Sequence, residues 1–234
     1  VCAHRADERF AMCSTFKWLL GAAVLERVDH GLLRLDQSVA YTEADLLAPD
    51  PITRPHVHEG QLPLGELCRG TIATSDNTAA NLILRQLGGP AELTRFLRAQ
   101  GDDTTRLDRD EPSLTTNLPG APRDTTTPRA MATTLARLIG EDRLSSASRE
   151  ILAAWLVGCE TGGQRLRGGF PADLRAGDKT GTGEYGATND VAVLWPRATP
   201  PLFIACYLSE SSRSTDELAA IHREVGRLVA RKMA

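Results

Sequence analysis

The hydrophobic pattern of the chain changes once, near Arg175. Before this residue the apolar segments have a helical period and end at glycine or proline. After it, three short β-branched or apolar runs are separated by turn residues, which predicts adjacent antiparallel strands. The last segment opens with Ser214 and Glu217 in capping-box spacing, which predicts a final helix. The expected fold class is therefore α/β of the α+β type, an antiparallel sheet flanked by helices plus an all-helical subdomain.

The chain has 234 residues, enough for one large domain or two closely packed ones. Helices are expected at residues 15–28, 63–74, 77–89, 90–102, 128–141, 146–159 and 215–232, and strands within 176–186, 189–196 and 201–209. The segment 104–128 has no period and is rich in proline and polar residues. A loop of this length inside a compact domain is usually functional or disordered.

Several classes of partner are excluded by composition. The net charge of −3 is too near neutral to indicate a nucleic acid or a membrane surface as partner. No apolar run reaches the roughly 18 residues of a membrane helix. The five cysteines form no C-x-x-C pair and the histidines no H-E-x-x-H motif, so no metal site is expected.

Lysine is scarce, and this scarcity points to candidate chemistry. Only three of the 27 basic residues are lysine, namely Lys17, Lys179 and Lys232. A lysine kept against such a bias suggests a need for a compact ammonium that can lose its proton, which arginine cannot do. Lys232 lies in the C-terminal tail, which leaves Lys17 and Lys179.

The segment around Lys179 allows two interpretations. Residues 181–186 fit G-x-G-x-x-G, the dinucleotide fingerprint, but that motif must lead from a strand into a helix. Here the glycines are followed by the apolar run 189–196, which is typical of a second strand. The alternative is the K-T-G triad at residues 179–181, typical of a serine hydrolase.

Two further motifs accompany this triad. Ser14 and Lys17 form S-x-x-K, whose spacing puts the two side chains on one face of a first helical turn, where a base can activate the hydroxyl. Residues 75–77 are S-D-N, which taken alone is most simply a helix N-cap. In K-T-G, the lysine supplies charge, the threonine a hydroxyl, and Gly181 is expected to let a substrate approach the strand.

The order S-x-x-K, S-D-N, K-T-G resembles the penicillin-recognising serine enzymes. Within segment 104–128, Glu111 opens an E-P-x-L sequence that resembles the Ω-loop motif of class A serine β-lactamases. Arg109 and Asp124 occupy positions that resemble those of the salt bridge that joins the two ends of that loop in the family. The sequence is identified as a member of this class over essentially its whole length.

The resemblance implies a β-lactamase/transpeptidase-like fold. Its sheet subdomain would comprise residues 1–12 and 167–234, and its helical subdomain residues 13–166, with an Ω-type loop at about 106–124. It also implies that a helix and a strand that precede this region in the family are absent from this sequence.

The resemblance further implies hydrolysis of the β-lactam amide through a serine acyl-enzyme, deacylated by a water that a glutamate activates. The implied catalytic residues are Ser14, Lys17, Ser75, Glu111 and Lys179, and the implied substrate-binding residues Asn77, Thr115, Arg165, Thr180, Gly181 and Thr182. The backbone N–H groups of Ser14 and Thr182 would form the oxyanion hole. No metal or organic cofactor is implied, and the protein is expected to be a monomeric bacterial enzyme, periplasmic or secreted.

Two departures from the family pattern bear directly on the site. The family usually has asparagine where Thr115 stands, and Asn117 is a candidate substitute for holding the deacylating water. The strand position that often carries an arginine is Thr188, so Arg165 is expected to bind the substrate carboxylate.

Three alternatives to a β-lactamase stay open at the level of sequence. They are a D-alanyl-D-alanine peptidase, a β-lactam sensor domain that acylates without turnover, and an inactive fragment. The substrate spectrum is open as well.

Overall fold

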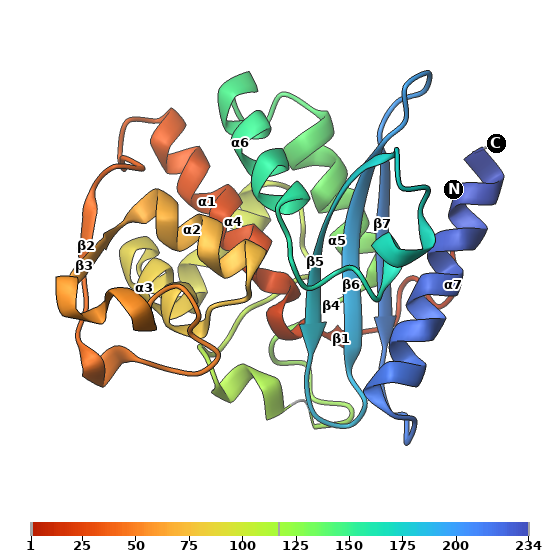
Figure 1. Cartoon of the computed structure of the whole chain (residues 1–234), viewed down its shortest axis with the longest axis horizontal. Helices are drawn as coiled ribbons and strands as arrows, with labels where there is room; N and C mark the ends of the chain where they lie inside the picture. The colour runs from red at the N-terminus through yellow and green to blue at the C-terminus, as the bar shows by residue number, and fades with distance from the viewer. Residues whose placement is uncertain (1, 117, 234) are drawn as a thin grey trace.

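The computed structural model describes residues 2–116 and 118–233. Figure 1 shows a group of helices beside an antiparallel sheet, with one long helix, α7, along the far side of the sheet. The fold is therefore the expected α+β arrangement, with helices on both sides of the main sheet. Among the described residues, none of the helices has the length and apolar composition needed to cross a bilayer.

The main sheet has the order β5-β6-β7 and is antiparallel throughout, which confirms the strands expected after residue 175. Its strands are β5 (Arg175–Thr182), β6 (Thr188–Trp195) and β7 (Leu202–Leu208). Alternate residues of β6 face opposite layers, as strand geometry requires. Ala192 packs in a cluster with Val225 of α7, whereas Val191 belongs to the larger core that contains Met131 of α5.

The helices fall close to their expected positions. They are α1 (Lys17–Asp29), α2 (Leu64–Ala73), α3 (Asn77–Leu87), α4 (Pro90–Ala99), α5 (Pro128–Leu135), α6 (Ser146–Val157) and α7 (Thr215–Met233). The predicted capping box is confirmed, because the Ser214 N–H donates to Glu217 Oε2 over 2.8 Å and the Glu217 N–H donates to Ser214 Oγ over 3.3 Å.

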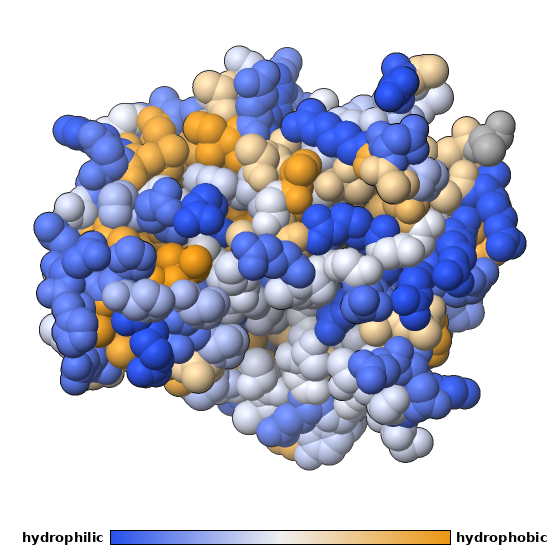
Figure 2. Space-filling view, in the orientation of Figure 1, coloured by the Kyte–Doolittle hydropathy of each residue, from blue (hydrophilic) through white to orange (hydrophobic). Residues whose placement is uncertain are grey.

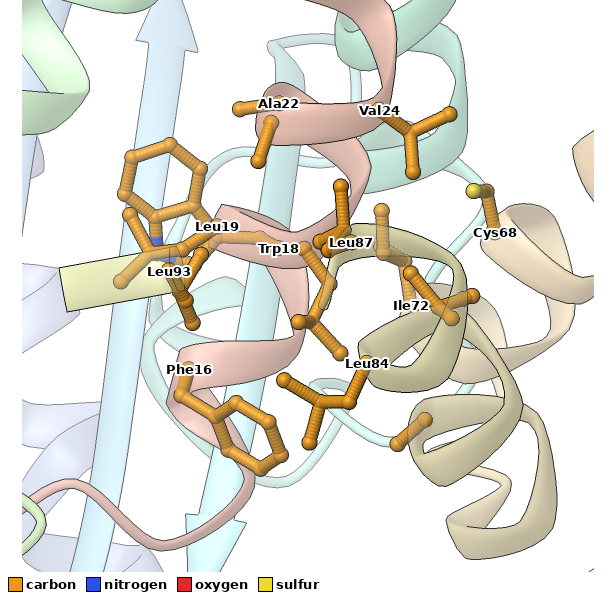
Figure 3. Close-up of a cluster of buried hydrophobic side chains, with 14 of the residues drawn as sticks. Phe16, Trp18, Leu19, Ala22, Val24, Cys68, Ile72, Leu84, Leu87 and Leu93 are labelled. Carbon is orange, nitrogen blue, oxygen red and sulfur yellow. The ribbon is translucent and has the colours of Figure 1, made fainter. Parts of the chain in front are cut away.

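Helix α1 is the centre of the helical region. Phe16 and Trp18, at its start, have no exposed surface, and side chains of α2, α3 and α4 surround the helix (Figure 3). In Figure 3, Trp18 and Leu19 lie near Leu93 of α4 on one side of α1, and Ile72 of α2 and Leu84 of α3 lie on the opposite side. All residues from Lys17 to Leu25 are buried, which requires such a shell on every side of the helix, and this shell fixes the residues that begin it.

Most of the short elements lie in segments that were expected to be loops. They are the strands β1 (Phe10–Ala11), β2 (Ser38–Ala40), β3 (Gln61–Pro63) and β4 (Thr125–Thr126) and the 3-10 helices η2 (Glu43–Asp45), η3 (Arg54–Glu59), η4 (Ser113–Thr116) and η6 (Leu166–Gly169). Two others belong to expected helices: the 3-10 helix η1 (Cys13–Phe16) leads into α1, and the π-helix η5 (Ala136–Gly140) continues α5. Strand β1 pairs with β4, so the chain just before Ser14 lies beside the end of the segment 104–128.

The surface in Figure 2 is mostly hydrophilic or neutral, and its apolar atoms form separate small patches.

Helix α5 lies in the range expected for the helical subdomain, yet it packs on β7 of the main sheet. The subdomain boundaries at residues 12 and 166 stay a prediction.

Candidate active site

Lys17 is the first residue of α1 and has no exposed surface. Its ammonium donates to Asn77 Oδ1 over 2.5 Å and to the Ser75 carbonyl over 2.8 Å. Glu111 Oε1 lies 3.1 Å from the same nitrogen. One buried ammonium thus joins three segments that are far apart in the sequence.

Ser75 lies between the two buried lysines. Its hydroxyl oxygen is 3.3 Å from Lys17 Nζ and 3.1 Å from Lys179 Nζ. Its backbone has a φ of +67°, a conformation uncommon outside glycine. The next residue, Asp76, caps α3 by accepting the Ala79 N–H, so the N-cap explanation holds for the aspartate of S-D-N.

Burial shifts the pKa of both lysines in the same direction. Loss of solvation lowers the pKa of Lys17, and the nearby Glu111 charge acts against that shift. Burial lowers the pKa of Lys179 to about 8, and the Lys17 charge adds to the decrease. Both amines can therefore give up a proton more readily than a lysine in water.

Glu111 is held by its backbone as well as its side chain. The Glu111 N–H donates to Asn81 Oδ1 over 3.0 Å, and Asn81 Nδ2 donates to the Glu111 carbonyl over 2.9 Å. Asn81 lies on α3, which also carries Asn77, so the same helix positions both partners of Lys17. The Glu111 side chain is 1% exposed, and within the described residues its carboxylate makes no hydrogen bond other than its contact with Lys17.

The salt bridge expected across the Ω loop is confirmed. Arg109 Nε lies 2.6 Å from Asp124 Oδ2, and Asp124 Oδ1 accepts the backbone N–H groups of Asp108 and Arg109. The Asp124 carbonyl accepts the Met12 N–H over 2.9 Å. The end of the loop is thereby joined to the segment that leads into Ser14.

Gly181 packs tightly against the segment that carries Ser14. A Cβ at this position would lie 2.8 Å from the Met12 carbonyl oxygen and 3.1 Å from the Ser14 N–H nitrogen. The missing side chain therefore makes room for the backbone that carries Ser14. On the side where a Cβ would lie, η1 occupies the space; the approach of a substrate to the strand at Gly181 stays a prediction.

Arg165 reaches the end of β5 from the segment before η6. Its guanidinium donates to Gly181 O over 2.8 Å, to Asn189 O over 2.6 Å and to Thr182 Oγ1 over 2.5 Å. The Thr180 hydroxyl, on the same strand, is 2.6 Å from the Thr161 hydroxyl. Hydroxyl groups and a guanidinium at one strand end suit a carboxylate ligand.

The glycines after K-T-G form a hairpin turn. The Gly183 N–H donates to Ala187 O, and β5 and β6 pair on either side of the turn. A dinucleotide fingerprint would require a helix at this point, so the structure excludes that interpretation. Among the described residues no group of three or more acidic, histidine or cysteine side chains could hold a metal ion.

Comparison with known proteins agrees with this geometry. Residues 1–233 match the model of the β-lactamase enzyme family. The chain is 46% identical to β-lactamase Toho-1 of Escherichia coli over 93% of this chain and 76% of that protein. It is 47% identical to β-lactamase L2 of Stenotrophomonas maltophilia over 97% of this chain and 75% of that protein.

Solved structures show which class of β-lactamase the chain resembles. An ancestral class A β-lactamase of Gram-negative bacteria superposes with a TM-score of 0.97 at 55% identity, over 99% of this chain and 88% of the other. The chain belongs to the class A β-lactamases. A putative class A β-lactamase PenP from Rhodopseudomonas palustris matches with the same TM-score at 50% identity, again over 99% of this chain and 88% of the other.

As a class A β-lactamase, the protein hydrolyses the β-lactam amide of penicillins and cephalosporins through a serine. Most of its predicted site residues form two groups in the structure. Hydrogen bonds and ion pairs connect Lys17, Ser75, Asn77, Glu111 and Lys179. The second group lies at the end of β5 and comprises Arg165, Thr180, Gly181 and Thr182.

Two predicted residues of this β-lactamase, Ser14 and Thr115, are not joined to either group by a side-chain hydrogen bond within the described residues. Within the described residues no hydrogen bond joins the Ser14 hydroxyl to the Lys17 ammonium, whose partners are on Ser75, Asn77 and Glu111. The Thr115 hydroxyl donates within its own loop, to Pro112 O over 2.7 Å. Asn117 lies outside the described residues.

Sequence reasoning missed the asparagines that hold the site of this β-lactamase together. Asn81 clamps Glu111, and Asn189 donates from its side chain to the carbonyls of Ala11 and Met12. The one available signal was polarity: Asn189 is followed by Asp190 at the start of an otherwise apolar strand, and both are fully buried. Buried polar groups need partners.

Proposed function

We propose that Ser14 is the nucleophile of this β-lactamase and that Lys17 and Glu111 share the work of moving its proton. The observation that carries the proposal is the buried Lys17 ammonium, 3.1 Å from Glu111 and within hydrogen-bond distance of Ser75. A serine hydroxyl attacks a carbonyl carbon only when a base removes its proton. Both candidate bases lie in this one buried cluster.

Two routes for that proton transfer fit the cluster. Lys17 can act as the base when it is neutral, a state that burial favours by lowering its pKa. Glu111 can act through a water between its carboxylate and the serine. The choice between the two is disputed in the family, and either route begins from the same arrangement.

Ser75 is proposed to pass a proton to the nitrogen of the opening ring. Its oxygen lies between two lysine ammonium groups, which favour the serine as a proton carrier. The negative charge that develops on the carbonyl oxygen would be bound by the Ser14 and Thr182 N–H groups. The close packing of Gly181 against the Ser14 nitrogen supports this pairing, because Thr182 is the next residue on β5.

Asn77 and the end of β5 are proposed to hold the substrate. The Asn77 amide would bind the side-chain amide of the β-lactam, and Thr180, Thr182 and Arg165 its carboxylate. The three hydrogen bonds of the Arg165 guanidinium to the sheet support this role, since they hold it in one orientation.

Deacylation is proposed to depend on a water activated by Glu111. The Asn81 clamp and the Arg109–Asp124 salt bridge support the assignment, because they fix the loop that carries the carboxylate. Thr115 would then act on this water only through the shape of the loop. The hydroxyl of Thr115 is already bonded to Pro112.

Two properties of the whole protein are also proposed. The related β-lactamases come from bacteria, which supports a periplasmic or secreted location, and we infer a monomer. Light scattering of the purified protein and assay of periplasmic and cytoplasmic fractions test these points, and a dimer or activity confined to the cytoplasmic fraction would contradict them.

The function is tested by following a chromogenic cephalosporin over many turnovers. The wild type should show sustained colour change at a constant rate, Ser14→Ala should show none, and Ser146→Ala, an exposed serine on α6, should match the wild type. A single burst of one equivalent from the wild type would instead indicate a peptidase or a sensor that acylates without turnover.

A further inference from the structure

Arg165 is buried at the edge of the site, and no acidic side chain pairs with it. Its exposed fraction is 8%, and its guanidinium donates to two carbonyls and one hydroxyl. Within the described residues no carboxylate lies in salt-bridge contact with it. Burial lowers the pKa of Arg165, and the charge of Asp190 acts against that shift. The charge of Arg165 is therefore not neutralised by a direct ion pair within the described residues.

Asp190, on β6, contacts the backbone next to Arg165. It is fully buried on β6, and it is paired with Thr180 in the sheet, so both side chains are on the same face. Asp190 Oδ2 accepts the N–H of Leu166, the residue that follows Arg165, over 2.9 Å. Asp190 Oδ1 has no hydrogen-bond partner among the described residues.

Two consecutive residues of β6, Asn189 and Asp190, hold Arg165 and its backbone. The carbonyl of Asn189 accepts the guanidinium, and the side chain of Asp190 accepts the N–H that follows Arg165. On the other side, the Arg165 N–H donates to Gly162 O over 2.9 Å. The backbone and the side-chain tip of Arg165 are therefore both fixed to the sheet.

A second buried carboxylate on this face already has a cation. Asp178 Oδ1 lies 3.2 Å from Arg167 Nε. Burial and the charge of Asp178 both raise the pKa of Asp190. Among the described residues, no basic side chain lies in salt-bridge contact with Asp190, which is one residue from the Asn189 carbonyl that accepts the Arg165 guanidinium.

We propose that Asp190 is a positioning residue for recognition of the substrate carboxylate, acting through Arg165. Its carboxylate accepts the N–H of Leu166, the residue after Arg165. Its negative charge stabilises the charged guanidinium through space, without forming an ion pair with it. A direct ion pair would neutralise the positive charge that the substrate must meet. The indirect contact orients the arginine and leaves its charge for the ligand. This inference rests on the proposed role of Arg165.

The test compares a penicillin with its carboxylate methyl ester as substrates. For each enzyme, kcat/KM is measured for acid and ester, and the acid-to-ester ratio is calculated. The ratio does not depend on how much of a variant is correctly folded, since both rates scale with the active fraction. The enzymes are the wild type, Arg165→Ala, Asp190→Asn, and Asp102→Asn as the matched control. Asp102 is also a buried carboxylate that accepts backbone N–H groups, but it lies in the turn after α4.

Asp190→Asn should lower the acid-to-ester ratio on the order of tenfold, with the loss in KM for the acid rather than in kcat. Arg165→Ala should lower it at least as much, and the double variant should be no lower than Arg165→Ala alone. Asp102→Asn should leave the ratio at the wild-type value.

The outcomes separate the two claims. A wild-type ratio in Arg165→Ala would overturn the proposed role of Arg165 and this inference with it. A reduced ratio in Arg165→Ala together with a wild-type ratio in Asp190→Asn would overturn the inference alone. An equal reduction in Asp102→Asn would also overturn it, because the effect would then follow from removing any buried carboxylate.

Discussion

Lys17 and Glu111 face each other in the interior, with charged atoms 3.1 Å apart and side chains that are 0% and 1% exposed. Two charges this deeply buried are stable mainly through each other and through their hydrogen bonds. A proton can move between them with little change in solvation, which suits both acylation and deacylation. The pair is the core of the proposed mechanism.

The Arg109–Asp124 salt bridge should hold the Ω loop in its active shape. Asp124→Asn removes a buried charge that accepts two backbone N–H groups besides the arginine. We expect a loss of about 3 kcal/mol in the free energy of unfolding, measured in urea, and a slower deacylation. The exposed Arg129–Asp7 pair is the control, and Asp7→Asn should leave the free energy of unfolding close to the wild-type value, because an exposed ion pair contributes little to stability. Equal losses in the two variants would contradict the expectation.

Gly181→Ala tests whether the glycine makes room for the Ser14 segment. The added Cβ would meet the Met12 carbonyl at 2.8 Å, so the backbone that carries Ser14 must move. We expect about 1–3 kcal/mol of destabilisation and a drop in acylation rate, measured by stopped-flow with a chromogenic substrate. Gly163→Ala meets no atom within 4 Å and should change neither quantity. Normal acylation by Gly181→Ala would show that the close packing is not needed.

The pKa of Lys179 predicts an alkaline limit to activity. Burial lowers it to about 8, so the ammonium that supports Ser75 is lost above that pH. We expect kcat/KM to fall as the pH rises through about 8. Lys179→Arg should lack this fall, because a guanidinium does not titrate in this range, even if the variant is slower overall. An unchanged profile in that variant would assign the limit to another group.

The same shift has a definite sign for stability. The folded protein loses the Lys179 proton near pH 8, whereas the ordinary value is 10.5. The unfolded chain therefore binds more protons between these values, and this lysine makes the free energy of unfolding increase with pH across that window.

His222 predicts sensitivity to acid. It is fully buried on α7, and its Nε2 lies 2.9 Å from Thr188 O. Burial lowers its pKa from 6.5 to about 4, so the unfolded chain takes up the proton first as the pH falls. The free energy of unfolding should decrease by up to about 3 kcal/mol from this group between those values.

His222→Gln should therefore show a smaller stability difference between pH 7 and pH 4.5 than the wild type, as measured by urea unfolding. The exposed His58→Gln serves as the control and should keep the wild-type difference. If His222→Gln keeps it as well, the acid sensitivity comes from other groups.

Local patterns predicted the helices and the main strands because each has a clear period and a clear end. Helix α3, for example, ends where Gly88 adopts a left-handed conformation. Strands β2 and β3 were missed because each has three residues and buries only one of them, which leaves no period to detect.

The scarcity of lysine and the order of three motifs were enough to predict most of the residues that the structure brings together in the candidate site. The contacts that hold it could not be predicted, because they join distant segments. Asn81 is 30 residues from Glu111, and Asn189 is 178 residues from Ala11. Gly181 shows a further limit: the sequence marks a close approach at this position but does not say which neighbour approaches.

The central claim is that Ser14 forms an acyl-enzyme that Glu111 removes, and intact-mass measurement during reaction with a penicillin tests it most directly. Glu111→Gln should gain and retain the mass of one penicillin, while the wild type returns to its starting mass and Ser14→Ala never changes. Labelling of Ser14→Ala, or normal turnover by Glu111→Gln without accumulated adduct, would contradict the account.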